Sequence, residues 1–222
     1  KQIIGDSTFS ASDFSGRNLE YGIREHAMGA IVNGITLHSH LIGYGSTFLV
    51  FSDYMRPSIR LAALMNVDSV YIFTHDSIYL GEDGPTHQPI EHLMALRLIP
   101  NLDVIRPSNS IEVEYAYRYA FTKSGNPKAI VLTRQNLEYL KFKNDYEDFV
   151  NGASIVADGT EITIFASGSE LELAFKVREY LKDTSVRIVS TPILNKLEKA
   201  EPEAIENLKV SNLNFTIELG RS

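Results

Sequence analysis

The sequence contains no cysteine and no long apolar run. Disulfides, thiolate zinc sites and a cysteine nucleophile are therefore excluded. No stretch approaches the roughly 20 apolar residues that cross a bilayer, and the first residues lack the apolar run of a signal peptide. We expect a soluble, intracellular protein of the cytoplasm with no membrane partner. Its chemistry must use His, Asp, Glu, Arg, hydroxyl groups or a cofactor.

Basic residues are also in the minority, with 21 Lys and Arg against 28 Asp and Glu and a net charge of -7. No basic block is present that could follow a phosphate backbone, so nucleic acid is not an expected partner. An apolar share of 44% over 222 residues is enough to bury a core in one or two domains.

Short β-branched and aromatic runs alternate along the chain with longer segments of helical spacing. The runs predict strands at 70–74, 128–133, 161–167, 186–191 and 214–219. The longer segments predict helices at 25–38, 53–66, 90–98, 110–123 and 170–181. This alternation predicts an α/β fold with a mainly parallel sheet flanked by helices.

Local signals mark two helix starts and one domain boundary. Asn109 with Glu112, and Ser169 with Glu172, have the three-residue spacing of a capping box. The polar, acidic stretch 141–148 has no clear period and separates the domains, which we place at 1–143 and 144–222. The chain starts without Met and stops after a predicted strand, so we expect the second domain to be truncated.

The most polar loop follows the predicted strand at 70–74. Residues 74–89 read THDSIYLGEDGPTHQP and contain two imidazoles, three carboxylates and turn-forming Gly and Pro. Active sites of open α/β sheets lie at such strand ends, and His is the usual proton carrier near neutral pH. A merely solvated loop is the alternative. The spacing of His75 and His87 matches no compact metal motif, so we predict no metal ligands.

Three other segments could carry chemistry, and each has a simpler explanation. Glu25 lies at a predicted helix start, where a carboxylate also favours the helix dipole. Phe48, Phe51 and Tyr54 form an aromatic stripe of the kind that is usually core. Arg134 follows a predicted strand, where it could bind phosphate or form a surface ion pair.

Taken together and in this order, the segments resemble transketolases. The most specific match is HDSI at 75–78 followed by GEDGPTHQP at 81–89. Supporting matches are GIREHAM at 22–28, TFLVFSDY at 47–54, RP at 106–107, TRQN at 133–136 and ASGSE at 166–170. The resemblance covers nearly all residues from Gly16 onward. It implies the thiamine diphosphate-binding fold, with a pyrimidine-binding (Pyr) domain followed by part of the C-terminal domain.

The resemblance implies a reaction of the pentose phosphate pathway. A two-carbon ketol unit would move from xylulose 5-phosphate to ribose 5-phosphate or erythrose 4-phosphate on thiamine diphosphate, which supplies the carbanion chemistry. Glu25 corresponds to the carboxylate that hydrogen-bonds the aminopyrimidine ring nitrogen. Phe48, Phe51 and Tyr54 correspond to the aromatic pocket around that ring.

The same match assigns residues to the sugar phosphate. His75 and Arg134 correspond to phosphate-binding residues, which agrees with the need for local cations in an acidic chain. Asp83 and His87 correspond to residues that contact sugar hydroxyls or the reacting oxygen, and His87 could also move a proton between oxygens.

The resemblance also implies partners. A diphosphate-binding domain, not present here, would hold Mg²⁺ and further histidines, so this chain alone is expected to be inactive. A homodimer is expected, because the cofactor of this family lies between subunits. The family's Gly-Gly-Ser-Ala-Asp-Leu segment has no counterpart at residues 1–10, so its phosphate-contacting Ser cannot be assigned.

Three alternatives stay open. Deoxyxylulose phosphate synthases share a Gly-Pro-Thr-His loop, although they typically lack the preceding Thr-His-Asp-Ser. Another thiamine enzyme, such as a 2-oxoacid dehydrogenase β subunit, would act on oxoacids instead of pentose phosphates. A non-catalytic module could keep the fold without the chemistry, but it would not need Glu25, His75, Asp83, His87 and Arg134 together.

Overall fold

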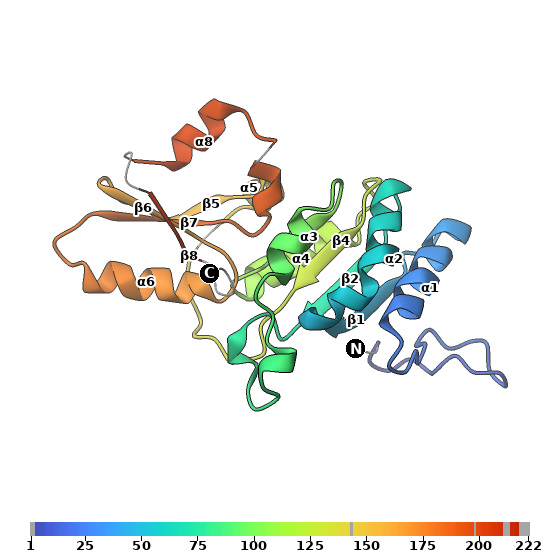
Figure 1. The fold of residues 1–222 in the computed structure, drawn as a ribbon. Helices are drawn as coiled ribbons and strands as arrows, with labels where there is room; N and C mark the ends of the chain where they lie inside the picture. The colour runs from blue at the N-terminus through green and yellow to red at the C-terminus, as the bar shows by residue number, and fades with distance from the viewer. Residues whose placement is uncertain (1–2, 143, 198, 211–213, 218–222) are drawn as a thin grey trace.

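A computed structural model of the chain describes residues 3–142, 144–197, 199–210 and 214–217. These residues form two sheets with helices packed on them (Figure 1). The first half contains α1 (Glu25–His38), β1 (Tyr44–Phe48), η1 (Leu49–Phe51), α2 (Ser52–Leu64), β2 (Val70–Thr74), η2 (Ile78–Leu80), η3 (Pro85–His87), α3 (His92–Arg97), β3 (Asp103–Ile105), α4 (Ser110–Ala120) and β4 (Lys128–Val131). The second half contains α5 (Tyr146–Asn151), β5 (Ser154–Ala157), β6 (Ile162–Ala166), α6 (Glu170–Tyr180), β7 (Val186–Ser190), α7 (Leu194–Leu197), α8 (Pro202–Leu208) and β8 (Asn214–Ile217).

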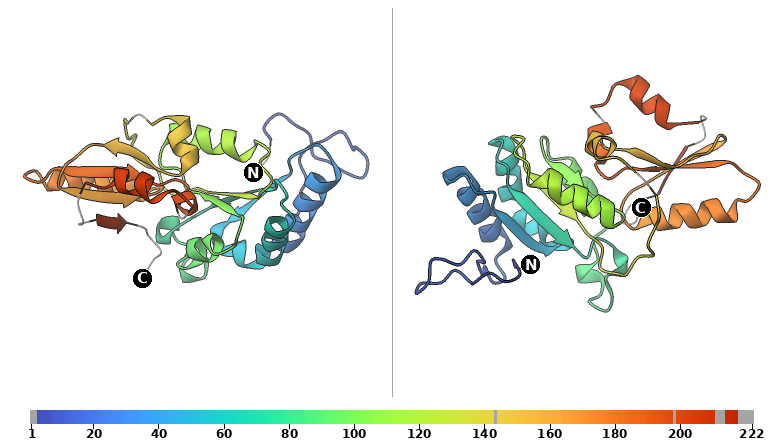
Figure 2. Two further views of the ribbon diagram at one scale, coloured as in Figure 1. Left: turned by 90° about the horizontal axis from the view of Figure 1, so that it is seen from above. Right: turned by 180° about the vertical axis from the view of Figure 1, so that it is seen from behind.

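The first sheet is wholly parallel, with the strand order β1-β2-β4-β3. Its central strand β2 is buried along its whole length, so both faces must be covered by helices. Tyr71 and Phe73 point into a core shared with α1, α2 and α3. Val70 and Ile72 point into a core on the other face, shared with α4 and α5. Figure 2 shows α4 over the face opposite to the α1 and α2 side seen in Figure 1.

The second sheet is mixed, with the strand order β5-β7-β6-β8. Strand β5 runs antiparallel to β7, whereas β6 pairs parallel with both β7 and β8. Leu171 and Ala174 of α6 pack on Ile164 and Ile188 of this sheet. The predicted α/β class, with a parallel sheet flanked by helices and a partial second domain, is confirmed.

The long helices and the apolar strands have bounds close to the predicted ranges, whereas several short strands were not predicted. The helix at 25–38 and the strand at 70–74 have the predicted bounds. Strands β1, β3 and β5 were not predicted; β3 has only three residues, and β1 includes Gly45 and Ser46. The prediction of strand at 214–219 was correct for 214–217, and residues 218 and 219 lie outside the described part of the chain.

One of the two predicted helix caps is present. The side chain of Asn109 accepts a hydrogen bond from the Glu112 backbone N–H at 2.9 Å. The capping box at Ser169 was wrong: Ser169 already has helical backbone angles and makes no side-chain cap bond. The Ser169 hydroxyl instead donates to Glu170 at 3.1 Å within a buried polar cluster. The Glu172 carboxylate, the other half of the predicted capping box, pairs with Lys176. Tertiary contacts therefore override the local signal at this helix.

The two halves share buried contacts. The amide of Asn195 in α7 donates to the Leu102 carbonyl at 2.9 Å and accepts from the Val104 N–H, covering the backbone of edge strand β3. Phe142 packs in the core of the second sheet, whereas Phe149 packs in the core of the first. The division into 1–143 and 144–222 stays a proposal that rests on the polar stretch 141–148, because side chains on each side of this boundary pack in the core of the other half.

Glu112 is a fully buried carboxylate between the two halves. It accepts hydrogen bonds from the N–H and hydroxyl of Ser108 at 2.8 and 2.7 Å, from the Asn144 amide at 3.1 Å and from the Ser190 hydroxyl at 2.6 Å. Burial nevertheless raises the pKa of Glu112 above its ordinary value of 4.5. Its contribution to stability is therefore complete below pH 4.5 and is lost as pH rises through the raised folded pKa.

We expect the Glu112→Gln variant to lose this pH dependence. Among the described residues, the Asn144 Oδ1 atom has no hydrogen-bond partner, so a flipped Asn144 can accept from the new amide and the substitution fits the site. Urea unfolding from pH 4.5 to pH 8 should show the variant gaining stability relative to the unsubstituted chain as pH rises. Glu114→Gln, on the exposed side of the same helix, is the control. Parallel pH curves for the Glu112 variant and the original would contradict the prediction.

Within the described ranges, no helix is both long enough and apolar enough to cross a membrane.

Candidate functional site at the carboxyl edge of the first sheet

Three parallel strands end together at one edge of the first sheet. Phe48, the last residue of β1, lies in register with Thr74, the last residue of β2. Phe73 of β2 lies in register with Val131, the last residue of β4. Except for Glu25, which begins α1 ahead of the first strand, the predicted site residues lie at or after strand ends at this edge, where ligands of open α/β sheets bind.

Phe48, Phe51 and Tyr54 form a ladder of stacked rings. The centroids of Phe48 and Phe51 lie 6.1 Å apart and those of Phe51 and Tyr54 lie 5.9 Å apart, with 18° between the ring planes in each pair. The 3₁₀ turn η1 explains this arrangement, since three residues per turn place side chains i and i+3 above one another. The two Phe rings are half-buried and Tyr54 is 64% exposed, so the stripe is not core.

Both histidines of the polar loop pack against this ladder. The His75 ring stacks on Phe48 with centroids 3.6 Å apart and 19° between the planes. The His87 ring meets Phe51 edge-on, with centroids 5.4 Å apart and 83° between the planes. His75 has a left-handed backbone, with φ of 62°, an uncommon conformation for a residue with a Cβ atom. The structure thus brings together five predicted site residues from β1, η1, α2 and the loop after β2.

The other three predicted site residues lie near these elements without joining the ring cluster. Glu25 is the first residue of α1 and is half-buried at a helix start that favours a negative charge. Asp83 is exposed between η2 and η3, and Arg134 is exposed three residues after β4.

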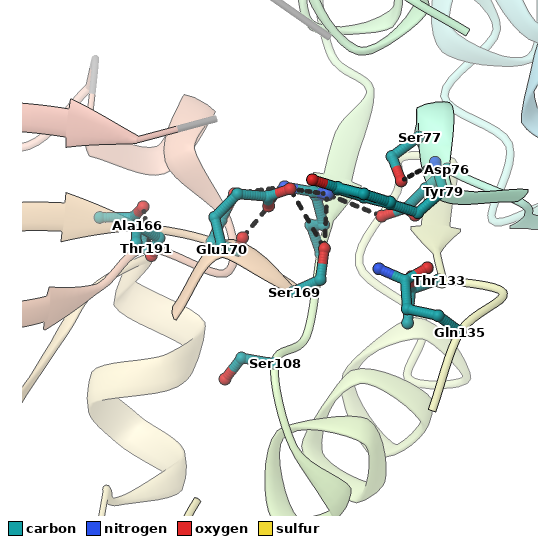
Figure 3. A network of polar contacts seen from close by, with 12 residues as sticks. Asp76, Ser77, Tyr79, Ser108, Thr133, Gln135, Ala166, Ser169, Glu170 and Thr191 are labelled. Carbon is teal, nitrogen blue, oxygen red and sulfur yellow. Dashed lines mark hydrogen bonds and ion pairs between the residues drawn. The ribbon is translucent and has the colours of Figure 1, made fainter. Parts of the chain in front are cut away.

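Sequence reasoning missed a buried ionic cluster around Arg106. Arg106 follows β3, and its side chain is completely buried. Its Nε and Nη2 atoms donate to Asp76 Oδ2 at 3.0 and 2.8 Å. Nη1 donates to the Ser167 carbonyl at 3.0 Å and to Glu170 Oε2, and Nη2 donates to Glu170 Oε1 at 3.0 Å. Figure 3 shows Asp76 on one side of this cluster and Glu170 with Ser169 on the other.

The cluster joins one cation to two carboxylates from opposite halves of the chain. Burial alone would lower the pKa of Arg106, but attraction to Asp76 and Glu170 outweighs it and raises the pKa. The only sequence signals for this arrangement were the Arg-Pro, His-Asp-Ser and Ser-Gly-Ser-Glu segments. Nothing in their spacing shows that they meet in space.

The histidine of α3 also lies beside two carboxylates, and one ligand atom from each of His92, Asp53 and Glu91 lies within 4.8 Å of the others. His92 Nε2 lies 3.2 Å from Asp53 Oδ2, whereas Nδ1 lies 3.9 Å from Glu91 Oε2. These three side chains are therefore close enough together to contact one metal ion. The expectation that this chain supplies no metal ligands stays a prediction.

Comparison with known proteins decides the family. Residues 4–139 match the model of the transketolase pyrimidine-binding domain. The chain belongs to the transketolase pyrimidine-binding domain family. A transketolase of Halalkalibacterium halodurans is 44% identical over 99% of this chain and 34% of its own length. The structure of a transketolase from Leishmania mexicana, 38% identical, superposes with a TM-score of 0.92 over 96% of this chain and 32% of that one.

This transketolase pyrimidine-binding domain chain thus spans about a third of the length of the relatives it matches. A further relative, a Pichia stipitis transketolase in complex with sedoheptulose 7-phosphate, is 38% identical with a TM-score of 0.89 over 98% of this chain and 34% of its own. The family depends on thiamine diphosphate. The half-exposed ladder of Phe48, Phe51 and Tyr54 fits that cofactor, because stacked aromatic rings bind a planar pyrimidine by its face.

Proposed function

We propose that this chain supplies the pyrimidine side of a transketolase active site. The observation that supports this most strongly is the ring cluster at the carboxyl edge of the first sheet. Two imidazoles pack on an aromatic ladder there, so proton-carrying groups stand beside a surface that can hold a planar cofactor ring. Thiamine diphosphate, when bound, would supply the carbanion chemistry of ketol transfer.

In this proposal Glu25 hydrogen-bonds a ring nitrogen of the aminopyrimidine and shares a proton with it. Its position at the start of α1 supports the assignment, because a half-buried carboxylate at a helix N-terminus is held in place and ready to receive a donor. Phe48, Phe51 and Tyr54 would form the wall against which the ring stacks, and they would keep water from one of its faces.

His75 and Arg134 would bind the phosphate group of the sugar, and Asp83 and His87 its hydroxyls or reacting oxygen. The crystal structures of Pichia stipitis transketolase with sedoheptulose 7-phosphate and xylulose 5-phosphate support sugar phosphates as the substrate class. Xylulose 5-phosphate as donor, ribose 5-phosphate or erythrose 4-phosphate as acceptor, and a place in the pentose phosphate pathway are parts of the same proposal.

A diphosphate-binding domain is the proposed partner, and it would hold Mg²⁺. We also propose a cytoplasmic homodimer as the working form. The first test is therefore complementation: this chain and the diphosphate-binding domain of a transketolase are mixed with thiamine diphosphate and Mg²⁺. Ketol transfer from xylulose 5-phosphate to ribose 5-phosphate should occur in the mixture and not with this chain alone. Turnover by the chain alone, or conversion of pyruvate instead, would contradict the proposal.

Substituting Arg134 should weaken substrate binding more than it slows turnover. A charge-assisted hydrogen bond is worth about 1.5–3 kcal/mol, so Arg134→Leu should raise the KM for ribose 5-phosphate about ten- to hundredfold. Steady-state kinetics of the complemented mixture measure this effect. Arg178→Leu, on α6 of the second half, is the matched control and should leave KM unchanged. Equal KM values for the two variants would remove Arg134 from the proposed site.

A further inference from the structure

We propose that Glu170, at the start of α6, is a positioning residue that fixes the His75 ring against Phe48 by acting through Arg106 and Asp76. The inference rests on the proposed role of His75 in holding the sugar phosphate. Under this inference, a residue of the second half of the chain orients a side chain of the site that the first half forms.

The argument begins with the residues on either side of His75. Thr74 is the last residue of β2 and is fixed by its register with Phe48. Asp76 is 2% exposed and is fixed by its side chain. His75 itself has a left-handed backbone, so its ring direction depends on both neighbours being held. A shift of Asp76 would therefore be passed directly to the imidazole stacked on Phe48.

Arg106 donates the hydrogen bonds that hold the Asp76 side chain. Two guanidinium nitrogens donate to Asp76 Oδ2, whereas Asp76 Oδ1 is buried and has no hydrogen-bond partner in the described part of the chain. The position of Asp76 therefore depends on where the guanidinium lies.

The second half of the chain determines where that guanidinium lies. Glu170 accepts from Nη1 and Nη2 of Arg106 with its two oxygens, the two-bond geometry that best orients an Arg side chain. Gly168, with φ of 59°, lies so close that a Cβ atom there would be 2.9 Å from the Arg106 side chain. Arg106 is thus held between Asp76 and the start of α6, and the polar contacts run from Glu170 to the residue beside His75 (Figure 3).

Glu170→Gln is the most informative variant, because it keeps the shape of the side chain. Only one end atom of the new amide accepts hydrogen bonds, so its NH₂ group would face a guanidinium donor. Arg106 should shift away from α6, and Asp76 should move with it.

The test is the NMR signal of the His75 ring protons in the labelled chain without ligand. A ring 3.6 Å above Phe48 lies in the shielding zone of that ring, so its proton signals are displaced from those of a free imidazole. In Glu170→Gln these signals should move toward free-imidazole values, while backbone amide signals of β2 and β4 stay in place. Glu172→Gln, on the same helix and paired with exposed Lys176, should leave the His75 signals unchanged.

In the complemented enzyme, the displaced ring should raise the KM for ribose 5-phosphate by about tenfold or more, with a smaller effect on kcat. If Glu170→Gln does not fold, Ser169→Ala takes its place in both measurements. The Ser169 hydroxyl lies 3.5 Å from Arg106 Nη2 and 3.1 Å from Glu170 Oε1, so its loss loosens the same cluster more gently.

The outcomes separate this inference from the proposed function. His75 signals that stay unchanged in the folded variant overturn the positioning role, even if His75→Ala weakens sugar phosphate binding. If the His75 signals move but neither Glu170→Gln nor His75→Ala changes the KM for ribose 5-phosphate, the structural coupling holds and the assigned role of His75 is wrong. Movement of the signals together with a raised KM in both variants supports both.

Discussion

Replacing Glu25 with alanine should reduce ketol transfer by the complemented mixture about 10²- to 10⁴-fold, the range of a positioned proton-transfer group. The proposed carboxyl group would hold the aminopyrimidine ring through a shared proton, and alanine offers no group in its place. Glu25→Gln keeps the size of the side chain but cannot take up a proton, so a loss of similar order is expected. Initial rates at saturating xylulose 5-phosphate and ribose 5-phosphate measure the effect.

Glu114→Ala is the control for this prediction, since it removes an exposed carboxylate from α4 on the other face of the sheet. Its rate should equal that of the original chain. A rate for Glu25→Ala within a few-fold of the control would show that Glu25 does not take part in the chemistry.

The largest expected loss of stability follows from substituting Arg106 with methionine. The variant leaves Asp76 and Glu170 buried together without a cation, and breaking a buried ion pair in this way costs about 3–5 kcal/mol. Urea unfolding should give a free energy of unfolding lower by that amount. A failure of the variant to accumulate as folded protein would be the extreme form of the same result.

Arg187→Met is the matched control for the stability prediction. Arg187 pairs with Asp158 at 2.7 Å, but the Asp158 side chain is 79% exposed, so water screens the pair and its loss should cost far less stability than loss of the buried cluster. Similar losses for the two variants would show that the buried cluster does not stabilise the fold through its charges.

How far the sequence could predict the fold depended on the length and apolarity of each element. Residues 25–38 and 70–74 show a clear period or a continuous apolar run, and their predicted bounds match the structure. Strand β1 was missed because it contains Gly45 and Ser46, and its strand geometry comes from pairing with β2 rather than from its own preferences. Strand β3 is three residues long at the sheet edge, too short for any period.

The ring cluster could be anticipated only through resemblance to the family. The spacing of Phe48, Phe51 and Tyr54 by itself indicates a core stripe, and the 3₁₀ turn that stacks the rings at the surface has no sequence signal of its own. The three-residue spacing therefore predicted that the three rings lie on one side, but it could not show whether that side is buried.

The Arg106 cluster could not be predicted from the sequence for another reason. Its members come from loops separated by 30 and 64 residues, and their contact depends on how the two sheets pack. The same packing removed Ser169 from its predicted capping role. Buried polar groups of this kind are set by tertiary structure, so local patterns can at most mark them as unusual.

The central claim, that this chain completes a thiamine diphosphate site, is tested most directly by proton exchange at the thiazolium carbon of the cofactor. The chain and a diphosphate-binding domain are mixed with thiamine diphosphate and Mg²⁺ in deuterated buffer, light scattering confirms that they associate, and NMR follows loss of the proton. Exchange should be accelerated in the mixture, but not by either component alone or by an equally associated mixture with Glu25→Ala. An associated mixture that exchanges the proton no faster than its separate parts would contradict the account.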